Sequence, residues 1–173
     1  MGTLNVDNIK DGAGGDNVVM PAGYVVQTIS ETITAQLAGS VGSAGTYIDT
    51  GVTASITPKF SNSKILVSFV FGAVGADSSG DSMFRLIRTS TAIAQGASGT
   101  YVSTIATRNL NSEISSTPSF MHLDSPSTTS ATTYKVQGSL SGSGTLAINR
   151  RQSDTTFGTA SSITLQEIAQ CQQ

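Results

Sequence analysis

Short apolar runs separated by turn residues constrain the fold of this chain more than any other feature. Residues 132–140 alternate cleanly between apolar and polar, as in a strand that buries one face. Clusters of Ser, Gly, Asn and Asp separate the runs and are typical of turns. The predicted strands are residues 24–34, 47–57, 64–74, 83–89, 92–95, 100–107, 119–123, 132–140, 145–149 and 162–169.

The residue types favour strands over helices throughout. Ile and Val together number 25 against 9 Leu, and 26 Ser and 23 Thr make up over a quarter of the chain. β-Branched residues fit a pleated surface, whereas the usual helix formers are scarce here. We therefore predict an all-β, antiparallel β-sandwich of the jelly-roll type and no helix.

The charge balance and the apolar runs argue against several classes of function. Nine basic residues stand against eleven acidic ones, with no basic run, so we expect no nucleic-acid partner. No apolar stretch is long enough for a membrane span, and we expect no membrane insertion. The single cysteine, Cys171, allows no intrachain disulfide, which indicates synthesis in a reducing cytoplasm.

The first 22 residues differ from the rest. Residues 3–11 alternate weakly, residues 12–17 are Gly-rich, and a second apolar run ends at Pro21. We predict an extended peptide and linker over residues 1–22, followed by a β-sandwich domain over residues 23–173. The expected anchoring residues of this peptide are Leu4, Val6, Ile9, Val18, Val19 and Met20.

Residues 64–74 form the most apolar run and predict a central buried strand. Its core-facing residues are expected to be Ile65, Val67, Phe69 and Phe71. The alternate positions are also mainly apolar, so a second layer or another subunit should cover them. Further along the chain, the Gly- and Ser-rich residues 141–144 predict a hairpin turn between two strands.

Aromatic residues in otherwise polar segments, and arginines within an apolar strand, are the candidate subunit contacts. Arg85 and Arg88 could pair with carboxylates such as Asp124 or Glu167 across an interface, or could face water. The full set for a homotrimer interface is Tyr101, Tyr134, Phe157, Arg85 and Arg88.

The sequence offers little for catalysis or cofactor binding. His122 is the only histidine, and no G-x-S-x-G motif is present, so no nucleophilic triad is expected. One histidine and one cysteine cannot supply a zinc site, although three His122 side chains on a three-fold axis remain an alternative. Asp77 and Asp81 lack EF-hand spacing and are interpreted as a solvated loop. We expect no enzyme activity, cofactor or metal within one chain.

Several segments in a shared order carry a resemblance to a known group of proteins. They are residues 3–11, the Val-Met-Pro of residues 19–21, and residues 25–28, 56–58, 63–67, 84–88, 123–126, 132–137 and 163–168. This order resembles that of tail-fibre-like virion structural proteins of marine and cyanobacterial phages. The resemblance implies a virion protein whose C-terminal domain is similar to the trimeric jelly rolls of the C1q and TNF type.

The expected function is therefore structural. We expect a tail fibre or tail-tip adhesin that docks on another virion protein through its N-terminal peptide. Its homotrimeric β-domain would be displayed toward host-surface glycans. The alternatives are a capsid decoration or head-fibre protein and a bacterial C1q-like adhesion module, the latter disfavoured because no secretory signal opens the sequence.

Overall fold

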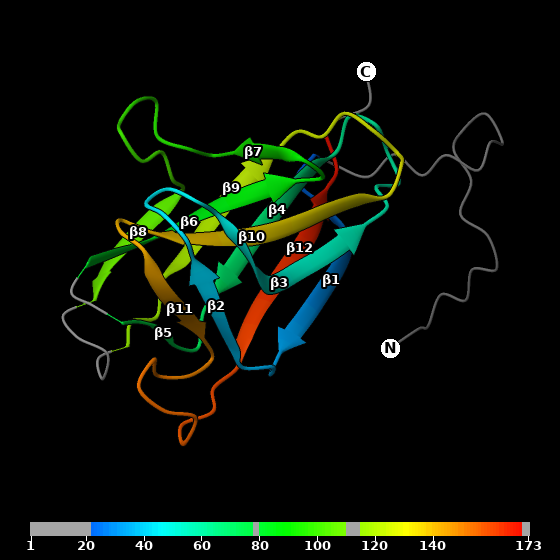
Figure 1. Cartoon of the computed structure of the whole chain (residues 1–173). Coiled ribbons are helices and arrows are strands. Elements are labelled where there is room, and N and C mark those ends of the chain that lie inside the picture. Colours follow the sequence, from blue (N-terminus) through cyan, green and yellow to red (C-terminus); the bar gives the residue numbers. More distant parts are fainter. Residues whose placement is uncertain (1–21, 78–79, 110–114, 171–173) are drawn as a thin grey trace, which may run out of the picture.

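The computed structural model describes residues 22–77, 80–109 and 115–170, which form strands, turns and loops (Figure 1). Within these ranges there is no helix, and hence none long and apolar enough to cross a membrane. The strands are β1 (Val25–Ile33), β2 (Leu37–Val41), β3 (Ile48–Ile56), β4 (Lys64–Val70), β5 (Val74–Ala76), β6 (Gly80–Arg88), β7 (Thr91–Ile93), β8 (Ile105–Asn109), β9 (Ser119–Asp124), β10 (Thr132–Leu140), β11 (Gly144–Ile148) and β12 (Ser161–Ile168).

Two large antiparallel sheets make up the sandwich. The first sheet has the order β1-β12-β4-β9, and the second has the order β3-β10-β6-β7, with β8 also pairing with β6. A small third sheet has the order β2-β11-β5. Along the chain β3, β4, β6, β9, β10 and β12 fall alternately in the second and first sheets, which is jelly-roll winding. The predicted all-β, jelly-roll-type sandwich is confirmed.

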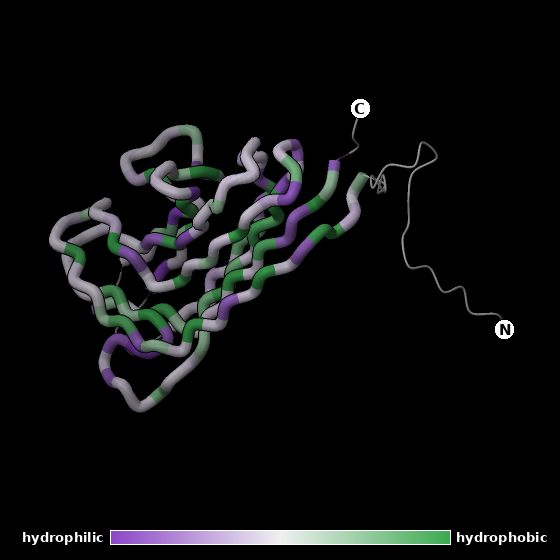
Figure 2. The backbone as a smooth tube through the Cα atoms, turned by 90° about the vertical axis from the view of Figure 1, so that its right-hand side faces the viewer, coloured by the Kyte–Doolittle hydropathy of each residue, from purple (hydrophilic) through white to green (hydrophobic). Residues whose placement is uncertain are grey.

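The core lies between the two large sheets because alternate side chains of each strand point inward. Figure 2 shows the resulting change between hydrophobic and hydrophilic along the strands. All four predicted core residues, Ile65, Val67, Phe69 and Phe71, are buried. The rings of Phe71 and Phe84 have centroids 4.7 Å apart and join the end of β4 to β6 of the opposite sheet.

The apolar run at residues 64–74 is broken into two elements. β4 ends at Val70, and β5 begins at Val74 in the third sheet. At Gly72, between them, a Cβ atom would meet the backbone oxygen of Ala160. The chain can pass this point only because residue 72 has no side chain.

The predicted hairpin at residues 141–144 is wrong. β10 already lies between β3 and β6, so both of its edges are paired. β11 consequently pairs with β2 and β5 in the third sheet. β2 itself was not predicted, because its sequence Leu-Ala-Gly-Ser-Val has little β-branched character.

The two ends of the described chain meet at one edge of the first sheet. The backbone N–H of Gly23 donates to the oxygen of Ala169 (2.9 Å), and the N–H of Ala169 donates to the oxygen of Tyr24 (2.8 Å). The N-terminal peptide is therefore joined to the domain beside the C-terminal end of β12. Its six predicted anchoring residues, Leu4, Val6, Ile9, Val18, Val19 and Met20, lie outside the described residues.

Candidate functional site

A buried polar cluster joins the two large sheets. Asp124, at the end of β9, accepts hydrogen bonds from Arg88 Nη1 at 2.9 and 3.0 Å. The hydroxyl of Tyr134, on β10, donates to Asp124 Oδ2 at 2.7 Å. Burial and then this hydrogen bond raise the pKa of Tyr134 above its ordinary value. The cluster therefore acts within one chain, as a polar connection between β9 and the opposite sheet.

This cluster corrects one prediction and reassigns another residue. Tyr134 is fully enclosed between the sheets, so it is a core residue and not part of a subunit interface. Arg88 pairs with Asp124 of its own chain instead of a carboxylate across an interface. Glu167, the other proposed carboxylate partner, is also buried, and it accepts from the backbone N–H groups of Lys59 and Phe60 at 2.8 and 3.1 Å.

The outward side of β4 and β9 carries the most exposed cluster of large apolar side chains on either sheet. Met121 is 61% exposed, Leu123 46% and Val70 42%. In the strand register Leu123 lies opposite Leu66, which is half-buried. A shallow hollow crosses the two strands between residues 68–70 and 119–121. We call Leu66, Val70, Met121 and Leu123 the outer apolar face.

His122 lies on the opposite side of β9 from the outer apolar face. Successive side chains of a strand alternate, so Met121 and Leu123 point outward while His122 turns toward the sandwich and is half-buried. A three-fold axis through the outer apolar face would not bring three His122 side chains together.

The outward side of the second sheet carries a charged network instead. Nε and Nη2 of Arg85 donate to Gln137 Oε1 at 2.9 and 2.7 Å, and the guanidinium stacks 4.0 Å from the centre of the Tyr47 ring. Gln137 Nε2 donates to Asp49 Oδ1 at 2.7 Å, and Lys135 Nζ to Asp49 Oδ2 at 2.9 Å. The hydrogen bonds from Gln137 and Lys135 lower the pKa of Asp49. We call these five side chains the Arg85 network.

A bulge in β3 builds this network. The register between β10 and β3 shifts between Lys135 and Gln137, and Gly51 in the bulged segment has φ +83°. A β-bulge bends a strand and re-aims neighbouring side chains. Here it places Asp49 directly opposite Gln137, within reach of Lys135.

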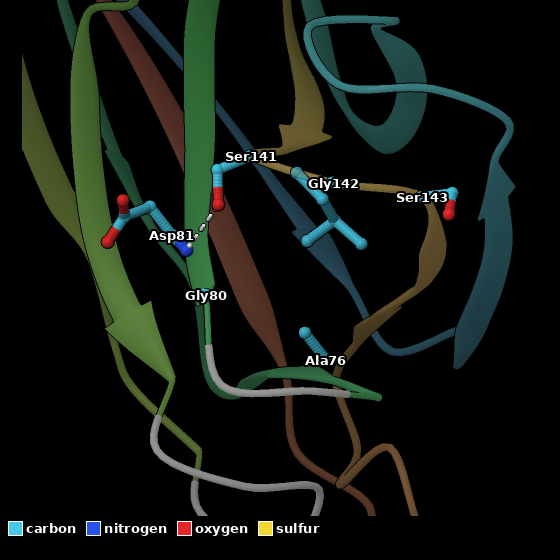
Figure 3. Close-up of a pocket in the computed structure, with 7 residues that line it drawn as sticks. Ala76, Gly80, Asp81, Ser141, Gly142 and Ser143 are labelled. Carbon is cyan, nitrogen blue, oxygen red and sulfur yellow. Dashed lines mark hydrogen bonds between the residues drawn. The ribbon is translucent and has the colours of Figure 1, made fainter.

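Another pocket, between β5, the start of β6 and the β10–β11 connection, is lined by residues that include Asp81 and Ser141 (Figure 3). The Ser141 hydroxyl accepts from the Asp81 backbone N–H at 2.9 Å, while the Asp81 carboxylate points away from the pocket and pairs with Arg108 at 3.6 Å. Asp77 accepts from the backbone N–H of Thr145 at 2.9 Å. The part of the chain that the structure describes contains no cluster of three or more His, Cys, Asp or Glu able to bind a metal.

The remaining interface candidates lie on separate loops. Tyr101 is 42% exposed in the connection before β8, and Phe157 is 50% exposed in the connection before β12. Figure 1 shows these two connections in different parts of the molecule. The Phe157 ring is stacked by Arg151 at 4.0 Å. The two aromatic residues do not form one surface, and Cys171 lies outside the described residues.

Comparison with known proteins gives a distant structural likeness and no family. No family model matches the chain, and no curated protein matches it. Among solved structures it is similar to the VP2 subviral particle of infectious bursal disease virus, with a TM-score of 0.38 and 14% identity. The match covers 85% of this chain and 39% of the other, so this chain spans less than half of that protein's length. The fold assignment rests on the strand order and not on this likeness.

The β4 half of the outer apolar face agrees with the prediction that another layer or subunit covers the alternate apolar positions of residues 64–74. The β9 half of this face and the Arg85 network are not predicted. The β9 half could have been found in Phe-Met-His-Leu at residues 120–123, where apolar side chains fall on both faces of one strand. The Arg85 network has no such signal, because Tyr47, Asp49, Arg85 and Gln137 come together only through strand pairing and the bulge.

Proposed function

We propose that this chain is a non-enzymatic structural protein of a phage virion, a tail fibre or tail-tip adhesin. In this proposal the N-terminal peptide docks on another virion protein, and the jelly roll is displayed as a homotrimer. The single observation that carries the proposal is the outer apolar face on a domain whose own core is complete without it.

A second copy of this chain is the occupant that suits the outer apolar face best. Exposed apolar side chains gathered on one sheet mark interaction surfaces, and Met121, Leu123 and Val70 are exposed together on one side of β4 and β9. The rest of the same sheet face presents Gln166, Lys64 at the start of β4, and small hydroxyl side chains. Of these, Thr164 and Ser30 hydrogen-bond to each other at 3.0 Å. Such a face can pack closely without burying an unpaired charge if Lys64, at the start of β4, stays at its rim.

The arrangement of the chain ends supports docking at one pole. Gly23 and Ala169 pair side by side. Because a three-fold axis places equivalent points of three copies at one level, the three N-terminal peptides would leave the trimer at the same end. Three peptides that leave together can each add a strand or an apolar anchor to a virion partner. The opposite end of each domain would then point away from the particle.

The side chains near His122 support a role without catalysis. The nearest carboxylate in sequence, Asp124, accepts from Arg88 and Tyr134. Among the described residues no hydrogen bond joins it to the imidazole, as a triad would require. A capsid decoration or head-fibre protein is the second reading, since it too needs an anchor and a displayed domain. The C1q-like adhesion module stays a more distant alternative.

Particle assembly tests the proposal. The full chain and a truncation that begins at Gly23 are each supplied during assembly, and their occupancy on purified particles is measured by quantitative mass spectrometry. We expect the full chain on particles, and the truncation folded, trimeric and absent from them. Normal occupancy of the truncation would contradict the anchoring role. Copy number separates the readings, because a tail protein is present in far fewer copies than a capsid decoration.

A further inference from the structure

An open hollow lies beside the Arg85 network, on the opposite side of the sandwich from the outer apolar face. Arg85 on β6 and Lys135 and Gln137 on β10 form one wall, and the turn between β6 and β7 forms the other. These side chains point outward because their neighbours Tyr134 and Leu86 point into the core. The hollow therefore stays open to solvent when copies cover the outer apolar face.

The hollow is cationic and its charges are fixed in place. Two cations, Arg85 and Lys135, share one anion, Asp49, in a chain whose net charge is −2. Hydrogen bonds to Gln137 and stacking on Tyr47 hold the guanidinium from two sides. A cationic side chain that is already ordered loses little conformational freedom when it binds an anion.

The guanidinium keeps a binding edge. Among the described residues its hydrogen bonds from Nε and Nη2 go to one oxygen of Gln137. The edge formed by Nη1 and Nη2 has the fork geometry that pairs with both oxygens of a carboxylate. The Lys135 ammonium has three N–H donors, and one of them donates to Asp49.

The rest of the lining suits a sugar ring. Thr89 and Ser90 bring hydroxyl groups to the rim, and Ile87 and Ala92 supply a small apolar floor. A pyranose presents the matching pair of surfaces, hydroxyl edges and a C–H face. Thr89 also has φ +57°, a conformation rare for a β-branched residue. The two-residue turn between the paired residues Arg88 and Thr91 requires such a conformation and fixes the position of this rim.

We infer that this hollow binds a sugar acid, a saccharide that carries a carboxylate. Arg85 and Lys135 would bind the carboxylate, and the hydroxyls of Thr89 and Ser90 would bind ring substituents. The inference deepens the proposed function, on which it rests, by naming a class of host-surface glycan and its place on the domain.

The test is a titration of the full chain, followed by NMR, with four probes. Two carry carboxylates, an oligogalacturonate and a sialylated oligosaccharide. The third is the methyl ester of the oligogalacturonate, which has the same rings without charge, and the fourth is a sulfated oligosaccharide. We expect at least one carboxylate probe to bind, with shifts confined to the hollow, and the ester and the sulfated probe to bind at least about tenfold more weakly.

Variants with equal charge change locate the site. Arg85→Gln and, separately, Lys135→Gln should weaken binding by about tenfold or more. Arg108→Gln is the matched control, because Arg108 is exposed on β8 and outside the hollow, and it should stay within about twofold of the unaltered chain. Unchanged circular dichroism and oligomer mass confirm that each variant is folded.

Four outcomes would overturn the inference: no binding of either carboxylate probe, equal binding of the methyl ester, stronger binding of the sulfated probe, or equal loss in Arg85→Gln and Arg108→Gln. A failure of the proposed function gives a different result from a failure of this binding site. A chain that binds the probe but is absent from particles would overturn the virion role, and a chain found on particles that binds no carboxylate probe would overturn only this site.

Discussion

At the scale of single residues, Phe69 contributes most clearly to the core. Its ring is 2% exposed and lies between Phe71 and Phe120, with centroids at 5.7 and 6.3 Å. We predict that Phe69→Ala lowers the free energy of unfolding by about 3–5 kcal/mol, measured by denaturant titration. Phe60→Ala removes the same ring from a 40% exposed position and should cost less than about 1 kcal/mol. Equal effects of the two variants would remove Phe69 from the core.

Tyr134 links the core to alkaline stability. Its pKa in the folded chain is raised by burial and by the hydrogen bond to Asp124, so the unfolded chain ionises first. The neutral Tyr134 side chain therefore stabilises the folded chain fully below the ordinary tyrosine pKa of 10.0. This contribution to the free energy of unfolding is lost as the pH rises above that value. Tyr134→Phe should lower the free energy of unfolding at neutral pH by about 1–2 kcal/mol and make its decline above about pH 10 less steep. An equally steep decline in the variant would contradict this role.

At the scale of elements, the bulge in β3 is the feature on which the Arg85 network depends. Gly51 has φ +83°, and an added Cβ would contact only Ile33 Cγ2 at 4.0 Å. The cost of Gly51→Ala is therefore conformational, and we predict a loss of about 1–2 kcal/mol in unfolding free energy. Gly42→Ala, where a Cβ meets nothing within 4 Å, should change stability by less than about 0.5 kcal/mol. Equal effects would mean that the bulge tolerates a side chain.

The sequence predicts single strands better than it predicts their partners. Period-two alternation predicts β10 and the core residues of β4, because the burial of one strand face requires an apolar residue at every second position of the sequence. Pairing depends on residues far apart in the chain, so the connection from β10 to β11 was misread as a hairpin. The sequence predicts Tyr134 at an interface because its neighbours are polar. In the structure Tyr134 lies on the side of β10 that faces the core.

At the scale of the whole molecule, the outer apolar face is the contact of the proposed trimer. We predict that Met121→Glu with Leu123→Glu places two charges in the subunit contact and converts the trimer to a monomer, measured by analytical ultracentrifugation. The domain should remain folded, because both side chains lie outside the core. Ser55→Glu, on the exposed side of β3 in the other sheet, should leave the trimer intact. A trimer that survives the double substitution would place the contact elsewhere.

The molar mass of the full chain in solution tests the central claim most directly, because a display module without an oligomeric contact leaves the outer apolar face unexplained. Light scattering coupled to size-exclusion chromatography, at micromolar concentration, gives this molar mass without calibration proteins. We predict about three times the chain mass of 17.7 kDa. A single species at 17.7 kDa would contradict the homotrimer and the covering of Met121 and Leu123 by other copies.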